Sequence, residues 1–573
     1  MKTATRSPTG SPADLLHAIQ IQVMWNRLIA VVEEQAQALL RTAFGSVARE
    51  AGDLSAGVYD SRGRMLAQAV TGTPGHVNTM ATAVRHFLDR FPPASMAPGD
   101  VYVTNDPWLG TGHLFDFVVV TPVFQGDRLI ALFASTCHTI DVGGIGFSAD
   151  ARSVFEEGTC IPHLRLSSAG QLNEDLLAIV QANSRNPVEA RGDILSLVSS
   201  NDVGCARLID MMAEFSLTSI DALAEHILSH SRAATLAAIG RLPDGTWEAR
   251  MQLDGYERAI ELRARLTIDG ERLVVDYAGS SPASRRGINS PKCYTDAYSV
   301  FGLKCLIAPD VPNNAGSLEP FEIIAPAGTV VSPLRPSPVT ARHVVGQMLP
   351  DLMFGCLAAA LDGRVPAESA GSIWVLAMAD SPRADGAPAS PFNVMSVGLG
   401  GTGARPTKDG LSTTAFPSGI GGIPIEITEA QAPVVFWQKE FLPDSGGAGR
   451  FRGGASQRIV IGGRNGAGFI CNAATFDRRS NPARGRQGGA DGAPGQVLIE
   501  TDGRLEPFTG KGTIVVPGGG RLRVDLPGGG GFGDPGERDR SAIARDVEYG
   551  IVTKAAAQSA YRLEQAKESP ETA

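Results

Sequence analysis

Two apolar segments separated by a short turn constrain the fold of this chain more than any other feature of its sequence. Residues 117–124 read FVVVTPVF, residues 128–137 read RLIALFASTC, and Gln125-Gly126-Asp127 lies between them. A turn of this length joins two antiparallel strands. Because both segments are apolar on both faces, we expect the hairpin to lie centrally in a sheet that is covered on both sides.

The residues at the mouth of this hairpin are of the types that bind divalent metals. If the turn is centred on Gly126, the numbers of paired residues sum to about 252, twice 126, and His138 lies opposite residue 114, beside His113 and Asp116. Two imidazoles and one carboxylate at one end of a buried hairpin predict a three-ligand metal site with a position left for water. His-x-x-Asp is a weak motif, and three polar loop side chains without a metal fit the sequence about equally well.

Neighbouring residues bear on this site in ways that the sequence leaves open. Pro122 cannot donate to the strand ladder, and a bulge there would shift the register by one residue without separating the three groups. Asp106 and Asp141 could supply a fourth ligand, hydrogen-bond a ligand, or close turns.

Signals along the rest of the chain predict a mixture of helices and strands. The first part is expected to contain helices at 12–43 and 77–90, a hairpin at 54–70, and mostly helix over 172–240. Strand signals recur after residue 242, interrupted by one helix at about 343–363 that we expect to kink at Pro350. From residue 385 glycine dominates, strand-like segments alternate with turns, and a helix at about 540–565 closes the chain.

These signals predict a multi-domain α+β chain. We expect an N-terminal mixed α/β region that holds the metal site (residues 12–240), a mixed β domain with one buried helix (241–384), and a glycine-rich β domain with a C-terminal helix (385–573).

Charge and composition exclude several classes of protein. The chain has 51 Lys and Arg against 60 Asp and Glu, a net charge of −9, and its basic residues are scattered, which argues against a nucleic-acid binder. No apolar run approaches the roughly 18 residues that cross a bilayer, and the N-terminus lacks the apolar stretch of a signal peptide. Seven cysteines without a CxxC pair are typical of a reduced chain, so we expect a cytoplasmic protein.

Other motifs fail when their context is considered. Residues 398–403 (GLGGTG) match GxGxxG, but no amphipathic helix follows them, as a dinucleotide site requires. Residues 509–512 (TGKG) lack the first glycine of a P-loop, so no ATP site of that type is predicted. His226 and His230 have the spacing of a zinc pair on a helix, but their polar neighbours favour a solvated helix face.

Several blocks of sequence together resemble the hydantoinase B/oxoprolinase family. In chain order they are GDLSAGVYDSRGRMLAQA, TPGHVNTM, PGDVYVTNDPWLGTGHLFDFVVVTPVF, STCHTIDVGG, DARSVFEEGTCIP, GINSPKCYTDAYSVFGLKCLIAPDVPNNAG, ARHVVGQML, LPDSGGAGRFRGG, PGGGGFGDPGERD and ARDVEYGIVTKAAA. The resemblance extends over nearly the whole chain past residue 12.

The resemblance implies one subunit of an ATP-dependent hydrolase that opens cyclic amides such as N-methylhydantoins and oxoproline. Related subunits serve in acetone and acetophenone carboxylases and in caprolactamase. It implies a hetero-oligomer in which a hydantoinase A-like partner binds ATP and Mg²⁺ and phosphorylates a carbonyl oxygen. The subunit similar to this chain would hold one divalent metal, zinc or manganese, with iron as a further option.

The resemblance also assigns residues. The family's metal ligands fall on His113, Asp116 and His138, the residues reached above from the hairpin. A further ligand would fall on Asp53, although Ala51-Gly52 before it departs from the bulkier residues of many relatives.

Two more residues are implied near the reacting groups. His76 lies in the matched block Pro74-Gly75-His76, which suggests that it lines the site. We expect His76 or Asp106 to accept the proton of the attacking water.

Three other functions fit the same residues. The chain could be a subunit of an ATP-dependent ketone carboxylase, a non-catalytic scaffold for the ATP-binding subunit, or a two-His-one-carboxylate iron oxygenase. Finally, the glycine-rich segments 398–403, 446–454 and 517–531 could allow close approach by a partner subunit, or could be ordinary β-turns.

Overall fold

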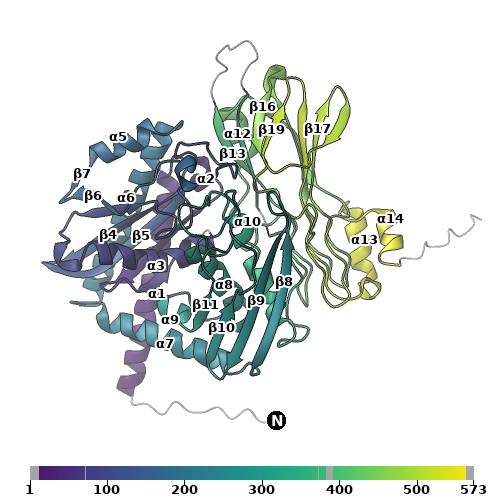
Figure 1. The fold of residues 1–573 in the computed structure, drawn as a ribbon. Helices are drawn as coiled ribbons and strands as arrows, with labels where there is room; N and C mark the ends of the chain where they lie inside the picture. Colours follow the sequence, from purple (N-terminus) through teal and green to yellow (C-terminus); the bar gives the residue numbers. More distant parts are fainter. Residues whose placement is uncertain (1–11, 71–72, 372, 382–391, 563–573) are drawn as a thin grey trace, which may run out of the picture.

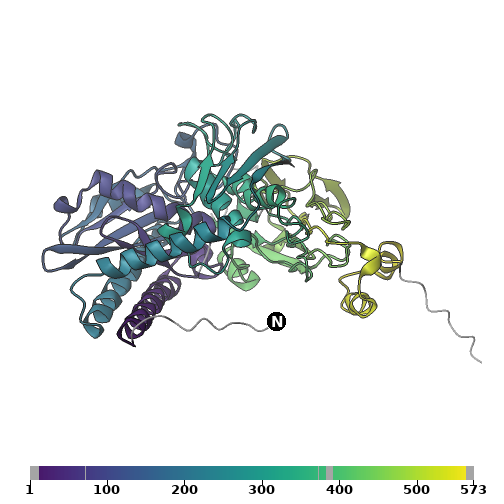
Figure 2. The same ribbon diagram turned by 90° about the horizontal axis from the view of Figure 1, so that it is seen from below.

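The computed structural model of the chain describes residues 12–70, 73–371, 373–381 and 392–562, with side chains described from residue 19 onward. Four sheets and the helices that cover them make up the fold (Figure 1). Seen from below, these parts follow one another roughly in chain order, from the seven-stranded sheet to the two small helices near the C-terminus (Figure 2). Helices and several sheets in one chain agree with the expected α+β class.

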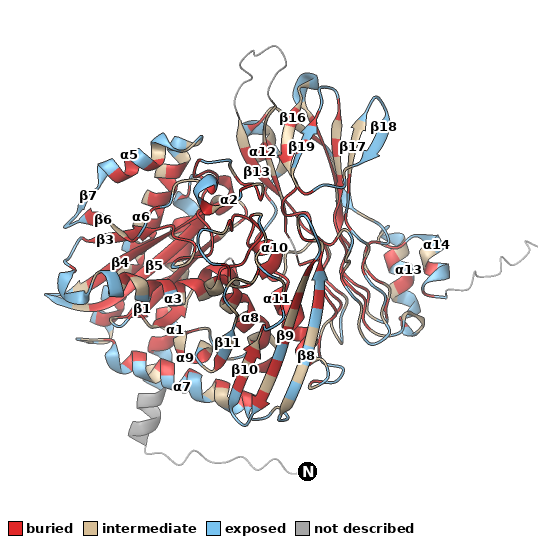
Figure 3. Ribbon diagram, in the orientation of Figure 1, coloured by how far each residue is buried: buried red, intermediate tan, exposed pale blue. Residues whose placement is uncertain are grey.

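A seven-stranded antiparallel sheet forms the first part, with strand order β2-β1-β5-β4-β3-β6-β7. Its strands are β1 (Leu54–Asp60), β2 (Met65–Gln68), β3 (Val101–Thr104), β4 (Asp116–Gln125), β5 (Arg128–His138), β6 (Leu164–Ser168) and β7 (Gln171–Leu172). Helices α1 (Pro12–Thr42) and α6 (Pro187–Glu214) pack on one face, and α3 (Pro74–Arg90) packs on the other. Two-sided cover explains why β4 and β5 are apolar on both faces and buried along most of their length (Figure 3).

The pairing of β4 with β5 differs by two residues from the expected register, because His138 lies opposite Asp116 and not opposite residue 114. One residue comes from the turn, where Gln125 pairs with Arg128, and the other from a slip of the ladder between Val123 and Phe124. The slip lies one residue beyond Pro122. The slip places His138 and Asp116 in one directly paired position, and it keeps His113 close by.

The second part is a four-stranded sheet with the order β11-β10-β9-β8. Its strands are β8 (Gly245–Leu253), β9 (Ile260–Asp269), β10 (Arg272–Asp276) and β11 (Phe321–Ile324), and it follows α7 (Asp221–Ile239). Its inner face packs against α11 (Leu349–Leu357), which in turn contacts α8 (Lys292–Ile307). Helix α8 also packs on α3, so this layer joins the first sheet to the second.

The single kinked helix expected at 343–363 is instead two short helices. Helix α10 (His343–Gly346) ends before α11 begins at Leu349, and α11 ends at Leu357. Pro350 lies in the first turn of α11, where its missing N–H has no helical partner to lose. Proline therefore starts a helix here and does not kink a longer one.

The third part consists of two sheets that share one apolar core. The strands are β12 (Trp374–Asp380), β13 (Asn393–Gly398), β16 (Phe469–Asn472) and β19 (Thr513–Val516) in one sheet, and β14 (Val434–Phe441), β15 (Gln457–Gly463), β17 (Gln496–Thr501), β18 (Arg504–Pro507) and β20 (Arg521–Asp525) in the other. Strand β12 pairs with both β13 and β16. The expected boundary between residues 384 and 385 lies outside the described residues, in the segment between β12 and β13.

The expected C-terminal helix at 540–565 is also divided. Helix α13 (Arg540–Glu548) and helix α14 (Lys554–Ser559) are separated by Gly550, whose φ of +70° lies in the left-handed region. Thr553 then caps α14 by accepting a hydrogen bond from the Ala556 N–H. Residues 563–565 of the expected helix lie outside the described residues.

Several glycines of the glycine-rich segments pack on one another inside the chain, whereas residues 517–519 are exposed. The Gly529 N–H donates to the Gly454 carbonyl (3.1 Å), the Gly447 N–H donates to the Gly529 carbonyl (2.8 Å), and the Gly530 N–H donates to the Glu368 carbonyl (2.9 Å). A Cβ on Gly529 would lie 1.9 Å from the Thr402 carbonyl oxygen. Glycine is needed here for close approach of backbones, because φ at these glycines is not in the left-handed region. We call residues 400–403, 446–454, 485–492 and 527–531 the glycine layer.

No helix in the described part of the chain is long and apolar enough to cross a membrane. All seven cysteines are free thiols.

Candidate metal centre

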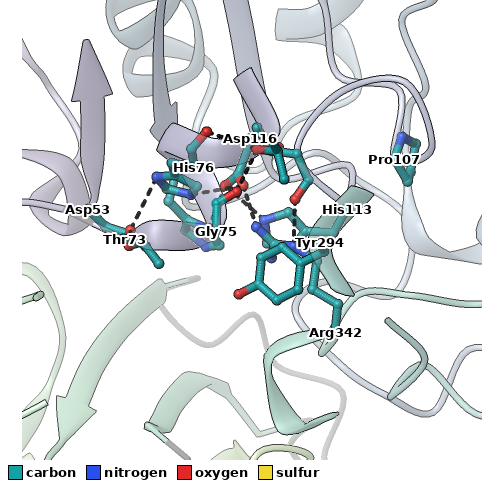
Figure 4. A network of polar contacts seen from close by, with 12 residues as sticks. Asp53, Thr73, Gly75, His76, Pro107, His113, Asp116, Tyr294 and Arg342 are labelled. Atoms are coloured by element: carbon teal, nitrogen blue, oxygen red, sulfur yellow. Dashed lines mark hydrogen bonds and ion pairs between the residues drawn. The ribbon is translucent and has the colours of Figure 1, made fainter. Parts of the chain in front are cut away.

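Strand ends at one edge of the seven-stranded sheet bring acidic and imidazole side chains together (Figure 4). Asp116 begins β4 and pairs with His138 at the end of β5. The backbone N–H of His138 donates to the carbonyl of Asp53, which directly precedes β1 (3.1 Å). Directly paired residues project to the same face of a sheet. That face is covered by α3, whose first turn carries His76.

The Asp116 carboxylate lies at the centre of the group and is fully buried. Its Oδ1 is 2.8 Å from His113 Nε2 and 3.2 Å from His138 Nδ1. Its Oδ2 is 3.0 Å from His76 Nε2 and 2.6 Å from Arg342 Nη2. Burial alone would raise the pKa of this carboxyl, but the surrounding His76 and Arg342 groups outweigh it and hold the pKa well below its usual range. Asp116 therefore stays ionised.

The tautomer of His113 indicates that a cation fits between this ring and Asp116. Its Nδ1 donates to the Thr340 carbonyl (2.9 Å), and a carbonyl can only accept. Burial and the Arg342 guanidinium lower the pKa of His113 to about 4, so the ring is neutral and its Nε2 carries a lone pair. That buried lone pair has no hydrogen-bond partner, yet it lies 2.8 Å from a carboxylate oxygen of Asp116. Two electron-rich atoms so close repel each other unless a cation lies between them.

The spacing of the three expected ligands suits a small divalent cation. The ligand atoms of His113, Asp116 and His138 all lie within 4.8 Å of one another, and all three residues are buried. Nitrogen and oxygen ligands at about 2.0–2.2 Å from a zinc ion require a similar spacing. The His138 ring is stacked on Phe115 with 12° between the ring planes, which fixes its direction. The residues present therefore fit a divalent metal.

His76 and Asp53 form a second pair next to these ligands. His76 Nδ1 is 3.5 Å from Asp53 Oδ1, and the Thr73 hydroxyl donates to the same oxygen (2.7 Å). Burial alone would lower the pKa of His76, but the carboxylates of Asp116 and Asp53 outweigh it and raise the pKa. His76 thus lies between two carboxylates, and Asp53 lies on the far side of His76 from Asp116, outside the three-ligand group.

A cavity of about 50 Å³ opens beside this group, enough for about three to five water molecules. Its polar side is formed by Asp53, His76, His113, His138 and Arg342. His343, at the start of α10, also lines the cavity, and its buried Nε2 has no hydrogen-bond partner. Burial and the adjacent Arg342 lower the pKa of His343 well below its usual range, so this ring is neutral.

The structure does not bring Asp106 or Asp141 to the cavity. Asp106 pairs with Arg335, and its Oδ1 accepts the backbone N–H groups of Trp108 (2.9 Å) and Leu109 (3.2 Å). Asp141 pairs with Arg185 (2.6 Å). Both carboxylates therefore fix the conformation of loops and do not line the cavity.

Sequence reasoning missed the second half of the site. Arg342, His343 and Thr340 come from a segment more than 200 residues after the hairpin, and Tyr294 carries the Arg342 guanidinium over its ring at 4.2 Å. The one available signal was the block ARHVVGQML, which includes Arg342 and His343 but suggested no contact with the hairpin.

Comparison with known proteins agrees with this picture of the fold. The family model described as hydantoinase B/oxoprolinase matches residues 17–535. A putative B subunit of a D-/L-hydantoinase from a Pseudomonas species is 26% identical, over 94% of this chain and 93% of that protein.

Two solved structures share the fold. One is an ATP-dependent caprolactamase from Pseudomonas jessenii, with a TM-score of 0.87, 24% identity, and coverage of 97% of this chain and 96% of that chain. The other is a nucleotide-free acetone carboxylase, with a TM-score of 0.82, 20% identity, and coverage of 96% and 80%. Since the family model covers most of the sequence, the chain belongs to the hydantoinase B/oxoprolinase family.

Proposed function

We propose that this chain is the metal-bearing subunit of an ATP-dependent cyclic-amide hydrolase, which attacks a carbonyl that a partner subunit has phosphorylated. The observation that carries the proposal is the buried His113 lone pair that faces the Asp116 carboxylate at 2.8 Å. Membership of the hydantoinase B/oxoprolinase family supports the reaction class.

His113, Asp116 and His138 would hold one divalent metal. A set of two nitrogen ligands and one oxygen ligand suits zinc or manganese, and it is also compatible with iron. The metal, when bound, would supply Lewis-acid chemistry and lower the pKa of a water molecule toward neutrality. Arg342 would offset the negative charge on Oδ2 of Asp116, which leaves Oδ1 for the metal.

His76 is our candidate for the proton acceptor. Its ring lies between the Asp116 and Asp53 carboxylates, which stabilise it when it takes up a proton. Asp53 would act by orienting His76 and not as a metal ligand. Asp106 is left out of the proposed chemistry because its carboxylate is bound by Arg335.

The activating step would come from a partner. A lactam carbonyl is a poor electrophile, and phosphorylation of its oxygen makes the carbon attackable. The sequence contains no P-loop, and a relative is described as one subunit of a hydantoinase, so we assign ATP and Mg²⁺ to a hydantoinase A-like partner in a hetero-oligomer.

A ketone carboxylase subunit is the second candidate, favoured by the structural likeness to acetone carboxylase. The two functions differ in co-substrate. A hydrolase turns over cyclic amides without bicarbonate, whereas a carboxylase turns over a ketone only when bicarbonate is present.

The test is to express the chain with and without a hydantoinase A-like ATP-binding subunit. Each preparation is loaded with Zn²⁺ or Mn²⁺ and assayed with ATP and Mg²⁺ on hydantoins, lactams and, with bicarbonate, ketones. We expect ATP-dependent ring opening by the pair alone. Ring opening by the single chain without ATP would contradict the proposal, and bicarbonate-dependent turnover of a ketone would replace it by the second candidate.

A further inference from the structure

The backbone carbonyl of Thr340 fixes the direction of the His113 ring. It accepts the hydrogen bond from His113 Nδ1 (2.9 Å). The rings of Phe115 and Phe147 pack around the imidazole, with centroids 5.6 Å and 6.4 Å from its own, and they restrict its movement without offering a comparable acceptor. A histidine whose second ring nitrogen bonds a fixed acceptor is held in one tautomer and one orientation. The direction of His113 Nε2 therefore depends on where the Thr340 carbonyl lies.

The segment that carries this carbonyl lies in the interior and precedes α10. Residues 339–341 are at most 1% exposed, so bulk water does not replace a missing hydrogen-bond partner there. The Ala341 N–H, which belongs to the same peptide group as the Thr340 carbonyl, donates to the Gly287 carbonyl (2.7 Å). The two N–H groups before it, on Val339 and Thr340, also need acceptors because they are buried.

One carboxyl oxygen of Glu157 accepts both of these N–H groups. Its Oε1 lies 2.6 Å from the Val339 nitrogen and 2.8 Å from the Thr340 nitrogen. Glu157 is the last residue of α4 (Val154–Glu157), it is fully buried, and its Oε2 has no hydrogen-bond partner. Burial raises the pKa of this carboxyl to about 7, so the group is costly to keep in the interior. What it provides in return is a fixed position for residues 339 and 340.

We propose that Glu157 is a positioning residue of the metal centre, which holds the Thr340 carbonyl in the place that directs His113 Nε2 toward the metal. This inference rests on the proposed function, because the metal is part of it. Glu157 is not among the residues that line the cavity, so it acts through the backbone of Val339 and Thr340. Without its oxygen, two buried N–H groups would lack an acceptor, the segment would move to find others, and the His113 ring would follow the carbonyl.

Cobalt binding tests this role without substrate, ATP or turnover. The metal-free, full-length wild type and each variant are titrated with Co²⁺, whose visible absorption reports the arrangement of its ligands. Glu157→Leu removes the acceptor and should weaken Co²⁺ binding about ten- to a hundredfold, the range for losing a group that holds a metal ligand, and it should change the spectrum. Glu157→Gln keeps a carbonyl oxygen that can accept both N–H groups, so it should restore the affinity and the spectrum.

Asp193 is a matched control in another part of the chain. It is also fully buried, its Oδ1 accepts two successive backbone N–H groups, those of Phe44 (2.8 Å) and Gly45 (2.9 Å), and its Oδ2 has no hydrogen-bond partner. Burial raises its pKa to about 6. Neither Asp193 nor the two residues that it holds line the cavity. Asp193→Leu should lower the urea midpoint as Glu157→Leu does, but it should leave the Kd for Co²⁺ and the spectrum unchanged.

The outcomes separate this inference from the proposed function. A wild-type Kd and spectrum in Glu157→Leu, or equal changes in Glu157→Leu and Asp193→Leu, would overturn the inference alone. If Glu157→Leu does not fold, Glu157→Asp, which withdraws the carboxyl by one methylene, takes its place under the same criteria. A wild type that binds no Co²⁺ would overturn the inference and the proposed function together. Failure of the paired subunits to open any ring with ATP would overturn the proposed function only.

Discussion

One added methyl group at Gly529 should destabilise the C-terminal half of this protein severely. A Cβ there would lie 1.9 Å from the Thr402 carbonyl oxygen, 2.3 Å from the Thr402 carbonyl carbon and 2.9 Å from the Gly403 nitrogen. All three are backbone atoms, which cannot rotate away as the end of a flexible side chain can.

The expected loss follows from what must move. Overpacking a tight interior costs about 1–3 kcal/mol. The displaced backbone also weakens the bonds from Gly529 to Gly454 (3.1 Å) and from Gly447 to Gly529 (2.8 Å), each worth about 1 kcal/mol. Gly529→Ala should therefore lower the free energy of unfolding by about 3–5 kcal/mol, a large share of the ~5–15 kcal/mol that is typical of a domain.

Gly422→Ala is the matched control, because the nearest atom to its added Cβ is the flexible Lys439 ammonium at 3.7 Å. Urea unfolding gives the midpoints of the wild type and both variants, and hydrogen exchange reports locally on residues 400–403 and 446–454. We expect a lower midpoint and faster exchange only in Gly529→Ala. A midpoint equal to that of Gly422→Ala would refute the reasoning that the glycine layer cannot accept a side chain.

Three further predictions concern the expected metal and the buried Glu157 carboxyl. Elemental analysis should find about one divalent metal per dialysed chain. His138→Ala should lose both the metal and turnover while its far-UV circular dichroism stays that of the wild type. Full metal content in this variant would show that His138 is not a ligand. Zn²⁺ or Mn²⁺ at about 100 times its Kd should stabilise the wild type by ~2.7 kcal/mol in thermal unfolding and His138→Ala hardly at all, and an equal shift in both would point to binding elsewhere. Glu157 is fully buried, and burial raises its pKa to about 7 from 4.5, so the stability it contributes is present below pH 4.5 and is lost as the pH rises through 7. The free energy of unfolding of Glu157→Gln, measured in urea and compared with that of the wild type, should therefore rise by about 2–3 kcal/mol from pH 5 to pH 8. A difference that stays constant across this range would contradict the prediction.

The local part of the site was predictable from the sequence because the hairpin is local. An apolar run on each side of Gln125-Gly126-Asp127 is enough to bring His113, Asp116 and His138 together. The exact pairing was not predictable, because a one-residue slip between Val123 and Phe124 depends on how the strands pack, and periodicity alone does not report it.

The other half of the site needed the tertiary structure. Thr340 sets the tautomer of His113, and Arg342 pairs with Asp116 while its guanidinium lies over Tyr294 of α8. No local pattern links these residues to a hairpin so far away in sequence. Asp106 was misleading for the opposite reason: it is near the ligands in sequence, but an Asx turn and Arg335 direct its carboxylate away from them.

The glycine layer also sets the order in which this protein can be completed during synthesis. Its central segment, residues 527–531, leaves the ribosome after its bonding partners at Glu368, Gly447 and Gly454. Strands β12 and β13, which line part of the cavity, lie in the part of the chain that these late contacts close. His113, Asp116 and His138 come together within the N-terminal sheet. The cavity beside them is completed only when residues 527–531 have emerged, and long-range contacts of this kind form slowly. A chain that ends before residue 527 would thus carry these three residues beside an unfinished cavity.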